Sequence, residues 1–458
     1  MSERTWHRRI TGAALATACL AAVAACAPGP SAAGGAGAPK TAGPVSTDPA
    51  ADGKVTLTEW DQNTDPGVNA STEKLNAAFM AKYPNVKIKR VSRAFNDLKT
   101  TLKLALSSNN PPDVVQANQG YPDMGAFVKA GLLQPVDRYA QAYGWPSSYP
   151  QQLLSLNKFT ADGRTWKTGN LYGVSQTGEI VGVYYNKDKL KQLGIAVPTT
   201  LSQFETALQQ AKAAGDLPIS FGNSNKSPAI QLFGVVQALT AGKQEVRNLV
   251  FSQGGAKWTD SGPVQTAGTL QDWVKKGYLS PGFDGQSSDQ AVAAFAQGKS
   301  VFMVDGSWQA AALAEKMDPK SVGFIALAPS GGASPVTQGG EGLAWAITSK
   351  SKHADVAAAY INFLVNDNGM KFVAAQGNLP AIVPGAYQPP AGTIYADLLA
   401  QWKAVSGQDG LLPYLDYTTP TFYDTLTAAL QEMLAGQQSP QKFGETLQND
   451  DSAFQKSR

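Results

Sequence analysis

Very few side chains in this 458-residue chain could act as nucleophiles or metal ligands. Both cysteines, Cys19 and Cys26, lie within the first 26 residues, and His353 is the one histidine after residue 25. Residues 27–458 therefore have no thiol for a disulfide, a thiolate metal site or a cysteine nucleophile. One imidazole excludes a multi-histidine zinc site, and a Ser-His-Asp triad would have to use His353. We therefore expect neither a metal nor a cofactor.

Two stretches instead combine aromatic rings with carboxylates. Trp60 and Asp61 lie at the end of a β-rich run, and the segment "YLDYTTPTFYD" contains Tyr414, Asp416, Tyr417 and Tyr423. Aromatic rings offer a flat apolar face and carboxylates accept hydrogen bonds, which together suit a hydroxyl-rich ligand. Two alternatives remain open: a half-buried tryptophan with a capping aspartate, and tyrosines that pack a core.

The first 25 residues are typical of a secretory leader. A basic start is followed by the apolar or small run Ile10–Ala25, which is shorter than the roughly 20 apolar residues that a spanning helix needs. "VAAC" (23–26) resembles a bacterial lipobox, in which Cys26 becomes the lipidated first residue of the mature chain. The alternative is a signal peptide cut at an Ala-x-Ala site. A partial twin-arginine match at "HRRI" (7–10) leaves the export route open.

Composition beyond the leader predicts a tether and a large neutral body. Residues 26–53 hold mostly Ala, Gly, Pro, Ser and Thr after Cys26, so we expect a flexible spacer. Without residues 1–25 the chain has 35 basic and 34 acidic residues, which argues against nucleic acid as a partner. A body of roughly 400 residues indicates two lobes or domains.

Short β-rich runs alternate with amphipathic helical patterns in this body. We expect strands at 55–60, 86–91, 112–117 and 179–186, and further ones in "LPISFGN", "SVFMVDG", "VGFIALAP" and "GLAWAIT". A helix over 201–215 is predicted to begin with a capping box at Ser202 and Glu205. The helix in "DTLTAALQEMLAG" is expected to end at Gly436. The alternation predicts an α/β fold with mainly parallel sheets.

Three longer segments resemble the extracellular solute-binding proteins of carbohydrate ABC importers, of the maltodextrin-binding type. They are, in order, "LYGVSQTGEIVGVYYNKDKLKQLGIAVPTTLSQF", "AVAAFAQGKSVFMVDGSWQAA" and "GGEGLAWAITSKSKHADVAAAYINFLVNDNGMKFV". The resemblance covers nearly all of the chain from about Lys54. It implies a two-lobe periplasmic-binding-protein fold of type II, with hinge-connected lobes around a ligand cleft.

The resemblance also implies where the lobes and hinges lie. The N-lobe would take 54–175 and 340–384, and the C-lobe 179–335 and 385–458. Hinges would lie near Val174–Glu179 and Val336–Gly340, where Gly339 and Gly340 suit a backbone that must change its dihedral angles.

Several site residues follow from matched positions. Gln116 and Asn118 follow a strand where the family places polar ligand contacts, Glu179 matches a ligand-binding acid, and Trp308 matches a tryptophan that stacks on a sugar ring. Further matched positions are Asn225 in the "GNSNKSP" loop, and Gly340 with Glu341 at the second crossing. The short stretches that contain the candidate site residues have no arginine and only one lysine, Lys226. This composition favours a neutral ligand.

The sequence thus predicts a monomeric, lipid-anchored receptor on the outer face of the cell membrane. It would capture a neutral mono- or oligosaccharide and deliver it to a two-permease ABC importer. The ATPase would be a separate chain, since no Walker-type phosphate loop occurs here.

Two rival functions remain open. A lipid-anchored glycoside hydrolase could draw its carboxylate pair from Glu179, Glu341, Asp61 or Asp416. A sensor or adhesin of the same fold would bind a non-sugar partner.

Overall fold

The computed structural model describes residues 43–332, 334–385 and 387–458. The predicted leader, Cys26 and residues 26–42 of the predicted tether lie outside these ranges. Val45–Arg458 form one compact unit. Within the described ranges, none of the helices is both long and apolar enough to cross a membrane.

The ordered body begins earlier than the composition predicted. The backbone N–H of Ser46 donates to Asp355 at 2.9 Å, and Asn85 donates its side-chain amide to the carbonyl of Pro49 at 2.7 Å. Residues 49–51 form a short 3-10 helix, η1 (Pro49–Ala51). Residues 46–53 are therefore docked on the body, because two polar side chains distant in sequence hold their backbone.

A four-stranded sheet is built from both halves of the sequence. Its order is β11-β3-β1-β2, parallel except that β11 runs antiparallel to β3. Its strands are β1 (Val55–Asp61), β2 (Val86–Ser92), β3 (Val114–Ala117) and β11 (Ala344–Ile347). Phe79 of α1 (Pro66–Lys82) packs on Tyr360 and Phe363 of α14 (Ala354–Val365), with ring centroids 5.3 and 5.4 Å apart. α1 and α14 contact each other although about 270 residues of sequence separate them.

The second sheet is mixed, which corrects the expectation of mainly parallel sheets. Its order is β12-β10-β6-β8-β7, and β9 also pairs with β6. The central strand β6 runs antiparallel to each of the three strands that it pairs with, β8, β9 and β10. The strands are β6 (Gly178–Asn186), β7 (Leu217–Ser220), β8 (Ser300–Gly306), β9 (Val322–Ile325), β10 (Thr337–Glu341) and β12 (Leu411–Leu412).

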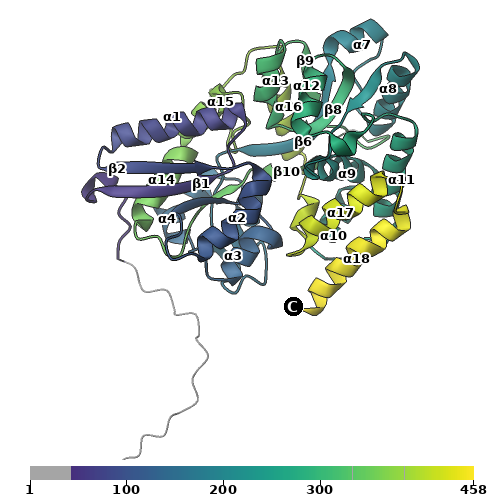
Figure 1. The fold of residues 1–458 in the computed structure, drawn as a ribbon. Helices are drawn as coiled ribbons and strands as arrows, with labels where there is room; N and C mark the ends of the chain where they lie inside the picture. Colours follow the sequence, from purple (N-terminus) through teal and green to yellow (C-terminus); the bar gives the residue numbers. More distant parts are fainter. Residues whose placement is uncertain (1–42, 333, 386) are drawn as a thin grey trace, which may run out of the picture. The chain divides into compact units, whose positions relative to one another are not determined.

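Helices surround both sheets (Figure 1). Phe204 of α8, for example, packs edge-on against Phe302 of β8 and Trp273 of α11, with centroids 5.1 and 5.8 Å apart. The remaining elements are α2 (Phe95–Ser107), η2 (Tyr121–Gly125), α3 (Ala126–Lys129), α4 (Asp137–Tyr143), α5 (Trp145–Ser148), α6 (Gln151–Leu156), β4 (Lys158–Phe159), β5 (Asn170–Leu171), α7 (Lys187–Leu193), α8 (Leu201–Ala213), α9 (Ser227–Thr240), α10 (Lys243–Val250), α11 (Ser261–Lys275), η3 (Phe283–Gly285), α12 (Ser288–Ala296), α13 (Gln309–Lys316), α15 (Asp367–Ala375), α16 (Ile394–Gly407), η4 (Leu415–Tyr417), α17 (Phe422–Leu434) and α18 (Pro440–Lys456).

Three segments cross between the two sheets side by side. Trp345 donates its backbone N–H to Val174 O at 2.9 Å, and Gly342 donates to Thr177 O at 2.9 Å. On the other side, Gly178 donates to Leu379 O at 2.9 Å. Residues 174–178, 342–345 and 379–381 therefore form a narrow, hydrogen-bonded connection.

Candidate functional site

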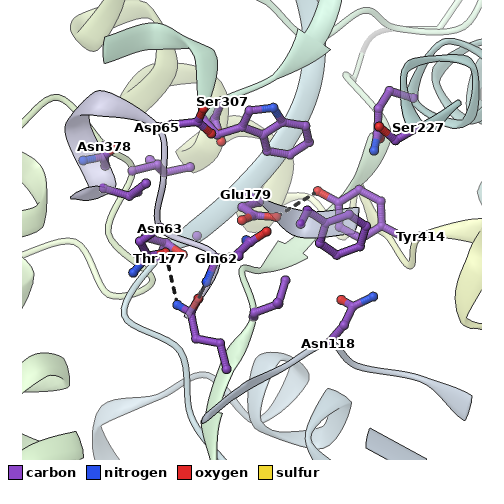
Figure 2. Close-up of a pocket in the computed structure, with 18 of the residues that line it drawn as sticks. Gln62, Asn63, Asp65, Asn118, Thr177, Glu179, Ser227, Ser307, Asn378 and Tyr414 are labelled. Carbon is purple, nitrogen blue, oxygen red and sulfur yellow. Dashed lines mark hydrogen bonds between the residues drawn. The ribbon is translucent and has the colours of Figure 1, made fainter. Parts of the chain in front are cut away.

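A pocket lies at this connection, and its walls come from the elements of both sheets (Figure 2). Its lining combines carboxylates, amides, hydroxyls and aromatic rings, and none of the lining residues in the described ranges is Lys or Arg. They are Gln62, Asn63, Asp65, Val68, Phe95, Gln116, Asn118, Thr177, Gly178, Glu179, Ser227, Ile230, Gln231, Ser307, Trp308, Leu343, Asn378, Leu379, Tyr414, Asp416, Tyr417 and Tyr423.

Glu179 supplies a carboxylate near the middle of the pocket (Figure 2). It stands on β6 opposite Gly340 of β10, and a Cβ on Gly342 would approach its Oε1 to 2.6 Å. The Tyr414 hydroxyl donates to its Oε2 over a long 3.5 Å. Burial raises the pKa of Glu179 to about 7, the Tyr414 bond lowers it and the charge of Asp65 raises it. Glu179 can therefore accept further hydrogen bonds from a ligand.

Trp308 supplies a half-buried aromatic surface directly after β8. A Cβ on Gly306 would lie 2.1 Å from the indole ring, so the glycine provides the space in which the ring rests. Behind it, the backbone N–H of Gly306 donates to Asp305 at 2.7 Å, and burial raises the pKa of Asp305 to about 7. A sugar ring could stack on this indole.

The predicted tyrosines do reach the same pocket. Tyr414 and Tyr417 meet edge to face, with centroids 5.6 Å apart. The Tyr417 hydroxyl donates to Gln119 Oε1 at 3.1 Å and lies 3.3 Å from Asn118 Oδ1. Asp416, between the tyrosines, also lines the pocket, and burial raises its pKa to about 6.

A chain of amides fixes the wall on the β1 side. Gln116 Oε1 accepts from the backbone N–H of Gln62 at 2.8 Å, and its Nε2 donates to Asn63 Oδ1 at 3.2 Å. Asn63 in turn donates to Thr72 Oγ1 at 2.8 Å. The Gln116 side chain is thus oriented before any ligand contact.

Eight residues predicted from sequence line this pocket. They are Gln116, Asn118, Glu179, Trp308, Tyr414, Asp416, Tyr417 and Tyr423. Five predicted residues do not line it: Trp60, Asp61, Asn225, Gly340 and Glu341.

The two on the first strand have protein partners instead. Asp61 is buried and accepts from Arg90 Nε at 2.7 Å and Nη2 at 2.8 Å, a bidentate ion pair. Trp60 lies under the guanidinium of Arg93, whose Cζ is 4.7 Å from the ring centroid. This corrects the expectation that both face the ligand, since Asp61 is already neutralised and Trp60 is already stacked.

The other three also have different surroundings from those expected. Glu341 is buried and accepts from Asn157 Nδ2, and burial raises its pKa to about 8. Gly340 contributes its backbone to the strand pairing with Glu179. Asn225 is exposed, and its Oδ1 accepts from the backbone N–H of Ser288 at 2.9 Å.

Sequence reasoning missed part of the lining. Ser307 directly precedes Trp308 and could have been found from it. Asp65, Gln231 and Asn378 belong to no aromatic-plus-acid pattern. They reach the pocket from a loop, from α9 and from the position just before the third crossing segment. In the described ranges, no group of three or more His, Cys, Asp and Glu is placed to hold a metal ion.

Comparison with known proteins gives concordant matches. A family model described as bacterial extracellular solute-binding protein matches residues 64–371. The "Multiple sugar-binding protein" of Streptococcus mutans is 26% identical over 72% of this chain and 76% of its own length. The melibiose/raffinose/stachyose-binding protein MelE of Bacillus subtilis is 24% identical over 86% and 88%. A solved chitin oligosaccharide binding protein, 22% identical, covers 88% of this chain and 99% of its own with a TM-score of 0.74.

Proposed function

Because the chain belongs to the bacterial extracellular solute-binding proteins, we propose that it captures a neutral mono- or oligosaccharide for a carbohydrate ABC importer. The observation that carries this proposal is the position of Glu179, Trp308 and Tyr414 around one pocket without a lining cation. Carboxylates accept the hydrogen bonds of sugar hydroxyls, and aromatic faces cover the apolar face of a sugar ring. Sites for anionic solutes commonly contain Arg or Lys side chains, so their absence from this lining favours a neutral ligand. The sugar-binding names of the relatives support the same ligand class.

The two sheets and the three crossing segments support a hinge mechanism. We assign 54–175 with 342–384 to an N-lobe and 179–341 with 385–458 to a C-lobe, with hinges in the crossing segments 174–178 and 342–345. The hinge expected near Val336–Gly340 falls on β10, which pairs with β6 in the second sheet. A sugar that contacts Gln116 from one side and Trp308 from the other gains contacts only when the lobes are closed. Binding would therefore shift the population toward the closed form by the free energy of those extra contacts. The closed protein, a monomer, would then dock on a two-permease complex whose ATPase is a separate chain.

Attachment belongs to the same proposal. Lipid on Cys26 would hold the chain at the outer face of the membrane, and residues 27–45 would connect it to the body that begins near Val45. The lipoprotein assigned to maltooligosaccharide transport in Streptococcus pneumoniae, 24% identical, is consistent with this attachment.

Binding without hydrolysis is the expected outcome. A glycoside hydrolase needs two carboxyl groups on opposite sides of one bond. Two of its four candidates are committed elsewhere, Asp61 to Arg90 and Glu341 to Asn157. Prolonged incubation with a disaccharide is expected to release no monosaccharide, and steady product formation would contradict the proposal.

A thermal-shift screen tests the ligand class directly. The purified chain is heated with neutral mono- and oligosaccharides, with sugar phosphates and peptides as controls. A ligand at 100 times its dissociation constant stabilises the folded state by about 2.7 kcal/mol. A selective shift with one class of neutral sugar is expected. A well-folded protein that responds to none of them would overturn the proposal and favour a non-sugar solute or a protein partner.

A further inference from the structure

One rim of the pocket is bridged by an asparagine that never reaches the lining. Asn96 lies in the first turn of α2, beside the four-stranded sheet. Its Nδ2 donates to the backbone carbonyl of Asn225 at 3.1 Å, and its Oδ1 accepts from the Tyr423 hydroxyl at 2.8 Å. Asn225 precedes α9 and Tyr423 is on α17, so both partners come from the elements around the other sheet. One amide therefore uses its donor and its acceptor across the cleft.

Tyr423 is held by α2 at its ring as well as at its hydroxyl. The ring of Phe95 meets it edge to face with centroids 6.1 Å apart, and Lys99 Nζ lies 4.7 Å from its centroid. Lys99 is fixed in turn by an ion pair with Asp123 at 2.8 Å. The Tyr423 hydroxyl therefore donates its hydrogen bond to Asn96, and Tyr423 lines the pocket with its ring.

Asn225 is a rigid partner because its loop is anchored on its own side of the cleft. Its side chain accepts from Ser288 N of α12 at 2.9 Å, and Asn223 accepts from Ala229 N of α9 at 3.0 Å. The carbonyl that faces Asn96 is therefore presented by a loop with fixed ends. This gives Asn225, which was predicted to bind ligand, a different role.

We propose that Asn96, Asn225 and Tyr423 form a clasp that stabilises the closed arrangement of the two lobes and raises affinity without a hydrogen bond to the sugar. The inference rests on the proposed function for its ligand, but every donor and acceptor in the clasp is a protein group. The clasp therefore favours closure whether or not the pocket is filled. Apparent affinity scales with the fraction of molecules in the binding-competent form. Asn96 is thus a positioning residue, and loss of one such hydrogen bond is expected to change the equilibrium by about two- to tenfold.

Distance measurements in the sugar-free protein test the clasp. The full chain carrying Cys19→Ser and Cys26→Ser has no thiol, so cysteines placed at the exposed Lys103 of α2 and Glu432 of α17 can be spin-labelled specifically. Pulsed electron paramagnetic resonance then reports the separation of the two helices. The background is compared with Asn96→Ala, with Tyr423→Phe, which keeps the ring, and with Thr100→Ala, a control on the exposed side of α2.

Asn96→Ala and Tyr423→Phe are each expected to move population to longer distances, and Thr100→Ala to leave the distribution unchanged. A sugar found in the screen should restore the short distance in both variants, with a dissociation constant raised about two- to tenfold. Identical distributions for Asn96→Ala and Thr100→Ala would overturn the clasp, whatever the sugar screen gives. If Asn96→Ala moves the distance distribution to longer values and no sugar stabilises the protein in the thermal-shift screen, the clasp is supported and the proposed ligand is overturned.

Discussion

Asp61 and Glu179 are both carboxylates at strand ends, yet their partners give them different roles. Arg90 neutralises Asp61 with two hydrogen bonds, whereas Glu179 faces the pocket with a long bond from Tyr414. Burial stabilises the protonated form of an acid that has no cation beside it. An acid next to a tryptophan in sequence is thus a weaker indicator of a binding site than an acid whose charge is left unpaired.

We expect Asp61→Asn to lower the free energy of unfolding by roughly 3 kcal/mol, because it leaves the half-buried Arg90 guanidinium without its charge partner. Urea denaturation measures this change. The control Glu73→Gln, an exposed partner 3.8 Å from Arg90, should cost less than about 1 kcal/mol. Sugar affinity of the folded variant should stay within about twofold. A large loss of affinity at full stability would instead place Asp61 in the site.

Trp308→Ala is expected to weaken sugar binding by about 1–3 kcal/mol, because the variant loses the aromatic face in a desolvated pocket. Isothermal titration calorimetry with the sugar from the screen measures the loss. Trp308→Phe keeps a smaller ring and should recover part of it. Equal affinity of the alanine variant and the natural protein would show that the indole does not contact the sugar.

The turn after β3 places Tyr417, and it depends on one glycine. Gly120 has φ +78°, and a Cβ there would lie 2.5 Å from the Cβ of Tyr417. Its ψ of −175° places Gly120 in a region that is essentially restricted to glycine, so Gly120→Ala should lose about 1–3 kcal/mol of stability from backbone strain alone. Gly131 also has a positive φ, +66°, but has open space around it and serves as the control, and Gly131→Ala should lose about 1 kcal/mol.

Gly120→Ala should in addition displace Tyr417 and lower sugar affinity several-fold, whereas Gly131→Ala should bind normally. Calorimetric titration and thermal melts separate the two effects. Equal affinities of the two variants would mean that Tyr417 does not position the ligand.

Local pattern predicted most of the described strands, but not their pairing or the caps of the helices. The expected strand at 55–60 is confirmed as β1, and Gly436 follows α17 with φ +73°. The capping box at Ser202 was wrong: Thr200 caps α8 by accepting from Gln203 N at 3.3 Å, so Ser202 lies inside the first turn. A cap at Ser202 and a cap at Thr200 both fit the polar residues of this stretch. The choice between the two caps depends on Leu201, which is buried in the core.

The two-lobe fold could be predicted because three matched segments occur in order, and the structural neighbours bear it out. The pocket could be predicted only in part. Alternation of residue types identifies strand ends, where Gln116, Glu179 and Trp308 lie, but it does not show which ends meet. Asn378 reaches the pocket through the third crossing, and Asn96 joins α2 to α17 across 327 residues of sequence. Such contacts depend on the tertiary arrangement, and local periodicity carries no information on them.

Buried acids in both halves of the molecule make its stability depend on pH. Burial raises the pKa of Glu341 to about 8 from 4.5, with an opposing hydrogen bond from Asn157, and burial raises that of Glu59 to about 8 as well. Between about pH 4.5 and 8 the unfolded chain ionises these groups while the folded chain keeps them protonated. The folded state then binds more protons, so the free energy of unfolding falls as pH rises through this window.

Glu341→Gln isolates one contribution, because glutamine is neutral at every pH and can accept the same bond from Asn157. The melting temperature of the natural protein should fall between pH 5 and pH 8, and that of the variant should fall less, by on the order of 2 °C or more. Glu73→Gln, at an exposed position, should follow the natural protein. Parallel melting curves for Glu341→Gln and the natural protein across this range would mean that Glu341 is already ionised in the fold, and that the connection between the sheets holds a charge.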